Sequence, residues 1–333
     1  LFAWIKLRDA PSSVGWTLTL GTTLGLGLLA KYAMVYSLFG LIVMSLVTRD
    51  RHVRRAIFLA ILLGLTLASP NLIWNAKQGF VTFSHTADNA GWKGVAWNWS
   101  GAGEFLVIQI VAFGPIFAAA LIPAIRQAVR RGNWLPVLLT VGIFTGVTLQ
   151  ALIRKANGNW AAPAFVAASV LAVPWCLLHW PRLAKLGLAL NLICAALVPA
   201  ATMAPETVQF RGESVFTRIT APVALGDHIT EAAMKSGVRA IVSDDRMMLA
   251  TLTWRLRESD LSVYALPPDG LPANHYEMEL QAPDDIGPVL LAVRRMPENC
   301  MRVTRPVAQP GLHHERRNLA AIELGIADRS CWE

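Results

Sequence analysis

Charged side chains are scarce in this sequence. Only 16% of its 333 residues are Asp, Glu, Lys or Arg, whereas 54% are hydrophobic, and the mean hydropathy is +0.44. An average soluble domain carries about 25% charged residues, so this composition excludes an ordinary soluble protein. The sequence therefore predicts an integral membrane protein.

Acidic residues are especially rare in the first part of the chain. Residues 1–204 contain 4 Asp and Glu against 16 Lys and Arg, whereas residues 205–333 contain 18 against 14. We therefore predict two domains, a basic transmembrane domain over 1–204 and a soluble domain over 205–333. Because the formal net charge of +8 arises in the membrane part, it gives no reason to expect a nucleic acid as partner.

The signatures of common soluble enzymes are also missing. The sequence has no phosphate-binding glycine loop, no Cys-x-x-Cys knuckle and no Gly-x-Ser-x-Gly turn. His313 and His314 are adjacent but lack a convincing third metal ligand, so a solvated loop is the favoured interpretation. The chain has neither an initiator Met nor a recognisable signal peptide. We therefore expect Leu1 to be an internal start, with membrane spans missing upstream.

Long apolar stretches fill the first part of the chain. A helix needs about 20 apolar residues to cross a hydrocarbon core of roughly 30 Å. Seven stretches are candidates for such spans: about 12–30, 33–47, 56–74, 104–125, 135–153, 161–178 and 185–204. The second is short, and with the first it could form a tight hairpin or a broken segment. The predicted fold class is an α-helical polytopic membrane bundle followed by a small α/β domain.

Basic residues are distributed unequally over the two sides that these spans would define. The chain start and the loops at 49–55, 126–131 and 179–185 carry 11 Lys and Arg together, and the other side carries 5. By the positive-inside rule, the first side is cytoplasmic. The loop at 75–103 and the soluble domain then lie on the other side. We expect a multi-pass protein of the bacterial inner membrane with a periplasmic C-terminal domain.

Short alternating segments and turn signals begin near residue 205. The segments "RAIVSDD" (239–245) and "PVLLAVRR" (288–295) predict strands. The segments "DHITEAAMKSG" (227–237) and "MLATLTWRLRES" (248–259) predict helices, the first of which ends at Gly237. Strands and helices in this order predict a small α/β domain.

Two groups of residues in this domain carry specific expectations. Cys300 and Cys331 would lie in an oxidising compartment, so we predict a disulfide bond between them. Asp244, Asp245 and Arg246 follow a predicted strand, where α/β domains often present binding groups. We favour the simpler interpretation, in which one aspartate caps the next helix and Arg246 pairs at the surface.

Four segments of the membrane part, taken in order, resemble a known family. They are "GLGLLAKYAMVYSLFGLIV" (25–43), "SPNLIWNAKQGFVTFSHTADNAG" (69–91), "GEFLVIQIVAFGPIFAAAL" (103–121) and "RKANGNWAAPAFVAA" (154–168). This set is similar to bacterial glycosyltransferase family 39, the membrane glycosyltransferases related to protein mannosyltransferases and to the aminoarabinose transferase that modifies lipid A. The resemblance covers roughly residues 20–205.

The resemblance implies a GT-C fold and a membrane glycosyltransferase. Such an enzyme takes a sugar from a polyprenyl-phosphate carrier and passes it to an envelope lipid, glycan or protein at the extracytoplasmic face. Its partners are then the lipid-linked sugar, the envelope acceptor and the membrane lipids. The family's catalytic Asp lies in the first extracytoplasmic loop, which we expect upstream of Leu1, so the catalytic residue is unknown in this chain. No cofactor is certain, and a divalent metal ion stays an open alternative.

Three cations stand where the family has basic residues. Lys31 follows a segment similar to the family's "GLALL", and Arg154 and Lys155 precede the proline of the next span. A donor phosphate gains negative charge as it leaves, so fixed cations near the interface would stabilise the transition state. Both Arg and Lys suit this task. The alternative is that each cation only anchors a span end at the headgroups.

The loop at 75–103 and the residue that follows it contribute His85, Asp88 and Glu104 as possible contacts of the substrate or of a metal ion. Asp88 and Glu104 are the only carboxylates on the predicted extracytoplasmic side of the membrane part, and His can act as a ligand or proton shuttle. The default interpretation is that His85 is a solvated loop residue and that the helix dipole favours Glu104 at a helix start.

Two other function classes compete with the transferase. A lipid-linked sugar transporter or flippase would also need interfacial cations, but the predicted spans hold few ionisable residues at mid-depth, which disfavours a transport pathway. A non-catalytic envelope binding protein would use the soluble domain to recruit a partner.

Overall fold

The computed structural model describes residues 1–91, 97–205, 207–210, 213–268, 270, 272–301, 304–306 and 322–332. The chain divides into two compact units, the first formed by Leu1–Phe80 and Thr86–Ala196 and the second by Val81–His85 and Leu197–Glu333. The predicted fold class, a polytopic helical bundle with a small α/β domain, is confirmed.

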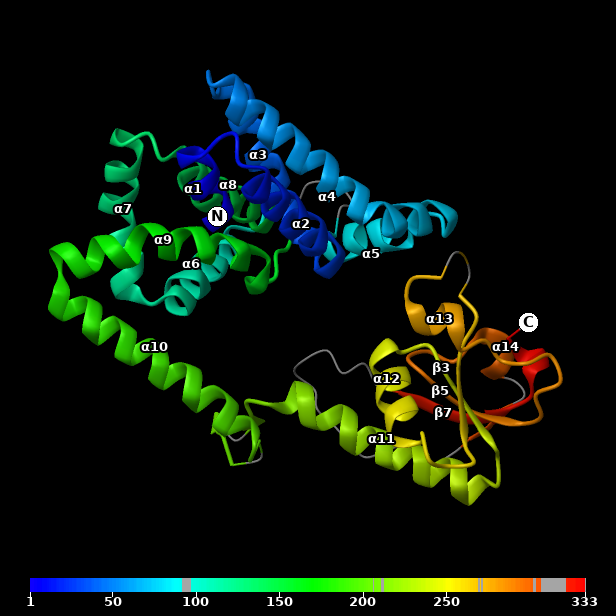
Figure 1. The fold of residues 1–333 in the computed structure, drawn as a ribbon. Coiled ribbons are helices and arrows are strands. Elements are labelled where there is room, and N and C mark those ends of the chain that lie inside the picture. Colours follow the sequence, from blue (N-terminus) through cyan, green and yellow to red (C-terminus); the bar gives the residue numbers. More distant parts are fainter. Residues whose placement is uncertain are drawn as a thin grey trace. The chain divides into compact units, whose positions relative to one another are not determined.

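Helices make up the first unit (Figure 1). In chain order they are α1 Phe2–Asp9, α2 Val14–Ala30, the 3-10 turn η1 Tyr32–Met34, α3 Val35–Val47, α4 Arg51–Lys77, α5 Val81–Ala90, α6 Trp99–Phe113, α7 Pro115–Arg130, α8 Trp134–Ile153, the 3-10 turn η2 Gly158–Ala161, α9 Ala162–His179 and α10 Pro181–Thr202. The main segment of the second unit begins at Leu197, within α10. Residues Val81–His85 of α5 also belong to the second unit.

Small residues let α2 and α4 approach each other closely. A Cβ atom added to Gly21 would lie 2.8 Å from the carbonyl oxygen of Ala60, and one added to Gly25 would lie 2.8 Å from that of Gly64. Helices in a lipid environment gain little from apolar burial and associate through such close packing. We infer that the glycines of "GTTLGLG" fix this helix pair.

The predicted span at 104–125 consists of two helices, α6 and α7, which together pass as one bent span. The chain bends by 96° between α6 and α7, and Figure 1 shows the turn. Gly114 adopts a φ of +91°, which residues with a Cβ rarely take. Pro115 then starts α7, where its missing N–H costs nothing. Asn191 of α10 donates a hydrogen bond to the Phe113 carbonyl at 3.3 Å and so supports the end of α6.

Fewer helices than predicted reach full membrane length. Within the described ranges, four helical segments are long and apolar enough to cross a membrane, or up to five if the bent pair α6–α7 counts as one span. The four are Arg51–Lys77, Trp134–Ile153, Gly158–His179 and Pro181–Thr202. The first two predicted spans form shorter apolar helices, Val14–Ala30 and Tyr32–Val47, because the chain turns at Lys31.

The second unit is built around a mixed sheet. Its elements are β1 Gln209–Phe210, β2 Glu213–Ser214, α11 Thr217–Ser236, β3 Ala240–Ser243, α12 Arg246–Arg255, β4 Ser262–Ala265, α13 His275–Glu279, β5 Val289–Val293, α14 Glu298–Met301, β6 Arg305–Pro306, β7 Glu323–Ala327 and the 3-10 turn η3 Arg329–Cys331. The sheet order is β4-β3-β5-β7-β6. Strands β4, β3 and β5 are parallel, and β7 runs antiparallel to β5 and β6.

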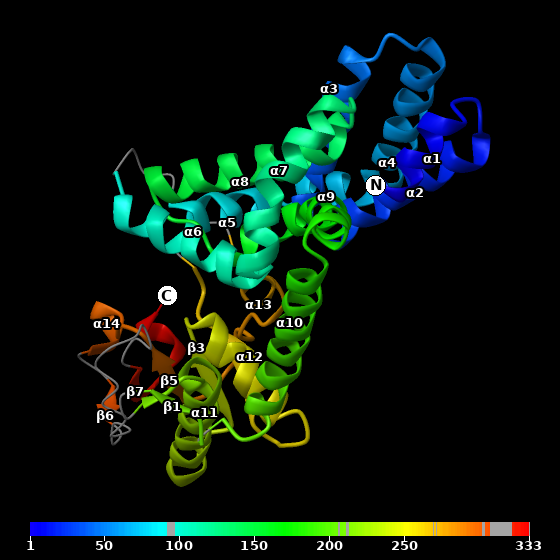
Figure 2. The ribbon, with the colours of Figure 1, turned by 90° about the vertical axis from the view of Figure 1, so that its left-hand side faces the viewer.

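Both faces of this sheet are covered. Ile241 and Leu290, which are register partners, pack against α11 and α12 through residues such as Ile229 (Figure 2). Val242 and Leu291 belong to the buried cluster on the opposite face. Since successive strand residues point to opposite faces, a strand covered on both sides is buried throughout, as β5 is. The two predicted strands and two predicted helices are all present.

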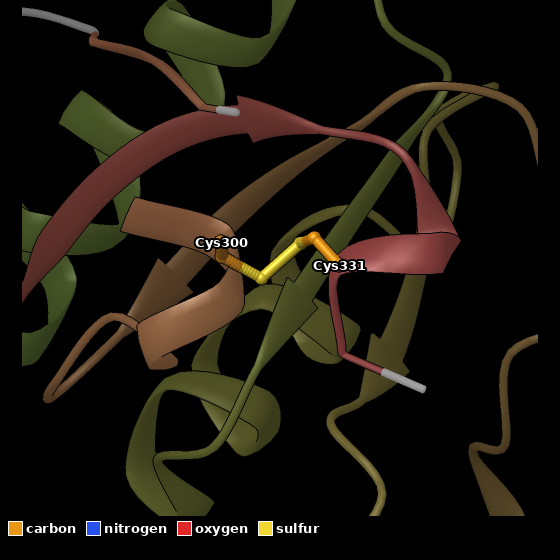
Figure 3. The surroundings of a disulfide bond; sticks show 2 residues. All are labelled: Cys300 and Cys331. Atoms are coloured by element: carbon orange, nitrogen blue, oxygen red, sulfur yellow. A yellow bond between two sulfur atoms is a disulfide. The ribbon is translucent and has the colours of Figure 1, made fainter. Parts of the chain in front are cut away.

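The predicted disulfide bond is confirmed. Cys300 of α14 and Cys331 of η3 are joined with a Cα–Cα distance of 4.7 Å (Figure 3). Both side chains are buried in the cluster on the face opposite α11 and α12. The bond therefore ties the last turn of the described chain to the core of the sheet.

The prediction that one of the two aspartates, Asp244 or Asp245, caps the next helix is confirmed. Asp245 Oδ1 accepts hydrogen bonds from the backbone N–H groups of Met247 and Met248 at 2.7 and 2.9 Å, which caps α12. Its Oδ2 pairs with the Arg294 guanidinium at 2.6 Å. Asp244 Oδ1 accepts a hydrogen bond from the backbone N–H of Arg294 at 2.9 Å. Burial raises the pKa of the Asp244 carboxyl. These groups fix the ends of β3 and β5 to the start of α12.

Candidate functional site

Lys31 lies in the turn between α2 and α3, beside a partly buried polar cluster. The Tyr32 hydroxyl donates a hydrogen bond to Asn71 Oδ1 and accepts one from Asn75 Nδ2 at 2.8 Å. Asn75 Nδ2 also lies 3.1 Å from the Asn71 carbonyl oxygen. The Lys31 side chain itself is exposed. The turn that carries Lys31 is thus fixed to the last part of α4 by its neighbour Tyr32.

Asn75 leaves one polar atom of this cluster available. Its side chain is 0% exposed, and Oδ1 has no hydrogen-bond partner among the described residues. A buried acceptor without a partner costs about 1 to 3 kcal/mol, so such an atom is a natural contact for a donor group of a ligand. The sequence signal was present, since Asn71 and Asn75 are spaced i, i+4 on one face of an apolar helix.

Arg154 and Lys155 lie in the turn that follows α8, and three amide side chains fix the backbone of this turn. Asn98 Nδ2 donates to the Arg154 carbonyl at 2.9 Å. Gln150 Nε2 donates to the Lys155 carbonyl at 3.1 Å. Gln109 Nε2 donates to the Gly158 carbonyl at 3.0 Å. These bonds use main-chain oxygens of the turn as acceptors and hold its backbone in place.

The two cations differ in their surroundings. Arg154 is half-buried and Lys155 is exposed. Gln109, next to this turn, is 5% exposed, and its Oε1 atom has no partner in the part of the chain that the structure describes. Sequence analysis did not select Asn98, Gln109 or Gln150, although a buried amide within an apolar stretch is a general sign of a functional or structural role.

The two turns share apolar neighbours. Leu28 and Met34 lie on either side of Lys31, and Ala151 and Trp160 lie on either side of the Arg154–Lys155 turn. All four belong to one buried cluster or pack against it. Both turns therefore rest on one core of the first unit. That one phosphate contacts all three cations stays a prediction.

The remaining sequence-predicted contacts are placed only in part. Glu104 is exposed in the second turn of α6, which begins at Trp99. The side chains of His85 and Asp88 lie outside the described residues, as do His313 and His314. Within the described ranges, no three His, Cys, Asp or Glu side chains are grouped so that they could hold a metal ion.

Two cavities of the first unit lie elsewhere, between α7 and α9. Their volumes are about 180 and 290 Å³. None of Lys31, Glu104, Arg154 or Lys155 lines them. They are therefore separate from the predicted donor site.

Comparison with known proteins tests the family resemblance. Residues 1–74 match the family described as dolichyl-phosphate-mannose-protein mannosyltransferase. The chain is 34% identical over 281 residues to the lipid A galacturonosyltransferase RgtD of Rhizobium johnstonii, in an alignment that covers 82% of this chain and 59% of that relative. The chain thus spans somewhat more than half the length of the curated relative that it matches. No solved structure matches the chain.

The family match includes part of the site described above. Lys31, Tyr32 and Asn71 lie within residues 1–74, whereas the turn with Arg154 and Lys155 lies beyond them. The apolar helices of the first unit agree with a membrane-embedded family. The resemblance in the sequence to the membrane glycosyltransferases related to the protein mannosyltransferases is thereby confirmed.

Proposed function

We propose that the protein moves a sugar from a polyprenyl-phosphate donor to lipid A. The observation that carries this proposal is the 34% identity, over 82% of the chain, to a lipid A galacturonosyltransferase. A galacturonosyl residue is accordingly the first sugar to test, and lipid A the first acceptor. The polyprenyl-phosphate donor rests on the family resemblance and on the exposed or half-buried cations at helix ends.

The chemistry assigns a task to those cations. An acceptor hydroxyl attacks the anomeric carbon, the bond from that carbon to the phosphate oxygen breaks, and the hydroxyl proton passes to a base. Polyprenyl phosphate then leaves with more negative charge than it carried in the donor. Fixed cations at the phosphate stabilise this charge more in the transition state than in the ground state. We assign this role to Lys31, Arg154 and Lys155.

The local structure supports this assignment. The backbone of each turn is held by side chains other than the cations, namely Tyr32 near Lys31 and Asn98 and Gln150 near Arg154. A preorganised turn loses little conformational entropy when a phosphate binds. The unpartnered oxygens of Asn75 and Gln109 are acceptors that suit sugar hydroxyls.

The same proposal includes a location. The 11 to 5 division of Lys and Arg supports placing the Lys31 and Arg154 turns and the second unit outside the cytoplasm. In a bacterium with two membranes, this corresponds to an inner-membrane protein with a periplasmic C-terminal unit. The buried disulfide between Cys300 and Cys331 supports an oxidising compartment.

The donor class is tested directly in membranes that contain the full-length protein. We expect sugar transfer to purified lipid A when the sugar is supplied on polyprenyl phosphate, and none when it is supplied only as a nucleotide sugar. Membranes from the same host without the protein are the control, and mass spectrometry of the extracted lipid A is the measurement. Transfer from the nucleotide sugar alone, in membranes depleted of polyprenyl phosphate, would rule out the proposed donor.

A further inference from the structure

A basic cleft lies between α7 and α9, at the end of the first unit where α8 begins. Its cavity of about 290 Å³ is lined by Pro123, Arg126, Gln127, Arg130, Trp175 and His179. The four residues of α7 are spaced i, i+3, i+4 and i+7, and the two of α9 are spaced i, i+4. Each set therefore occupies one face of its helix, and the two faces meet at the cleft.

Among the described residues, no acidic side chain lines this cleft. Arg126, Arg130 and Arg131 fall within six residues of one another, and no Asp or Glu occurs between residues 105 and 205. Within the described ranges, none of these arginines forms an ion pair. Like charges this close repel each other, and an anion that binds among them removes this cost.

His179 adds a further polar atom. Its Nδ1 lies 2.8 Å from the Trp175 carbonyl oxygen, and its ring is stacked on the Trp175 ring with centroids 4.3 Å apart. A carbonyl oxygen only accepts, so Nδ1 carries the proton and donates it to this bond. Nε2 is then the ring nitrogen that remains for a ligand. The stacked pair holds the imidazole at the wall of the cleft.

An apolar cavity adjoins the basic one. Gln127 and Trp175 line both, and the second cavity, of about 180 Å³, is walled mainly by apolar residues of α7 and α9, including Ala124, Val170, Leu171, Pro174 and Leu178. A basic compartment beside an apolar one matches a ligand with an anionic head and a hydrocarbon chain. Span-end arginines that served only to orient the protein would need neither cavity.

The cleft is distinct from the proposed donor site. Arg131 and Asn133, which line the apolar cavity, lie just before the start of α8. Arg154 follows the end of α8, and a helix of 20 residues is about 30 Å long. One ligand head cannot contact both ends of this helix.

We propose that the α7–α9 cleft binds an anionic phospholipid, with the headgroup phosphate between Arg126 and Arg130 and an acyl chain along the apolar cavity. Basic clefts between membrane helices are suited to anionic headgroups. The guanidinium groups bind the phosphate oxygens, His179 Nε2 contacts the headgroup, and the bound lipid joins α7 to α9. The proposal does not depend on the sugar or acceptor of the transfer reaction.

The test uses the full-length protein in a neutral detergent with added lipid. We expect phosphatidylglycerol to raise the unfolding temperature and to remain bound in native mass spectrometry, whereas phosphatidylcholine and inorganic phosphate do neither. In the double variant Arg126→Ala, Arg130→Ala the affinity for phosphatidylglycerol falls at least about 10-fold, since each charge-assisted contact contributes about that factor. The matched control is Arg182→Ala, Lys185→Ala, which removes two cations of α10 that do not line the cleft.

Each other result overturns the proposal. Equal losses in the two double variants would mean that lipid binds by general surface charge. Equal stabilisation by inorganic phosphate would assign the cleft to a free anion. If the double alanine variant does not fold, Arg126→Gln alone is compared with Arg182→Gln, and equal lipid affinities of these two proteins would exclude the site.

Discussion

Replacing Lys31, Arg154 or Lys155 by Ala in the full-length protein lowers sugar transfer by roughly 10- to 150-fold. In the proposed donor site, each substitution removes a charge-assisted contact to the phosphate, worth about 1.5 to 3 kcal/mol in the transition state. Membrane insertion should be unchanged, because hydrogen bonds of Tyr32, Asn98 and Gln150 anchor the two turns. The measurement is kcat/KM for the polyprenyl-phosphate donor at matched protein levels.

Lys77 provides the matched control for these variants. It is an exposed lysine in the last turn of α4, on the same predicted side of the membrane as Lys31. Lys77→Ala should leave transfer within about twofold of the parent, since a headgroup anchor contributes little to the reaction. If Lys31→Ala and Lys77→Ala behave alike, Lys31 is an anchor and the phosphate role is lost. Arg154→Lys separates charge from the bidentate geometry of the guanidinium.

Removing the disulfide with the double variant Cys300→Ala, Cys331→Ala lowers the stability of the second unit by about 3 to 4 kcal/mol. The bond closes a loop with a sequence separation of 31 residues, and chain-entropy estimates for such loops lie in this range. Hydrogen–deuterium exchange of the full-length protein should accelerate in β5 and β7, whose residues form the core beside the bond. Exchange in the membrane helices should not change.

Cys194→Ala is the control for the disulfide variant. Cys194 is a free and exposed cysteine of α10, so its removal should not alter exchange in the sheet. Thiol alkylation of protein isolated without reductant gives a second readout. Two freely alkylated thiols at positions 300 and 331 would mean that the bond does not form in the cell, and they would also remove one support for the periplasmic location.

Local patterns in the sequence predicted the second unit well. The short apolar runs in "RAIVS" and "PVLLAV" are strong strand signals. Gly237 ends α11 in the left-handed conformation that glycine favours. The pairing of Cys300 with Cys331 followed from the compartment and from the number of cysteines outside the spans. The strands and the end of α11 depend on residues close in sequence. The disulfide could be predicted because only two cysteines lie outside the predicted spans.

The first unit shows what local patterns miss. Hydropathy alone does not reveal a 96° bend, because Gly114 and Pro115 are tolerated in straight membrane helices when neighbours satisfy the backbone. The polar cluster of Tyr32 and Asn75 joins residues 43 positions apart. Such a contact depends on the packing of α2 against α4, which no single segment encodes. The shared site of the three cations stays a prediction, which rests on their place at span ends and on the family resemblance.

Mass spectrometry of lipid A from living cells tests most directly the proposal that the protein transfers a sugar to lipid A. Lipid A is compared between the parent bacterium, a strain lacking the gene, and that strain complemented with the full-length gene. We predict that the mass of one sugar residue is present in the parent, absent in the deletion strain and restored by the parent gene but not by the Lys31→Ala variant at equal protein level. Identical lipid A in the parent and deletion strains, when the parent is shown to produce the protein, would contradict the claim.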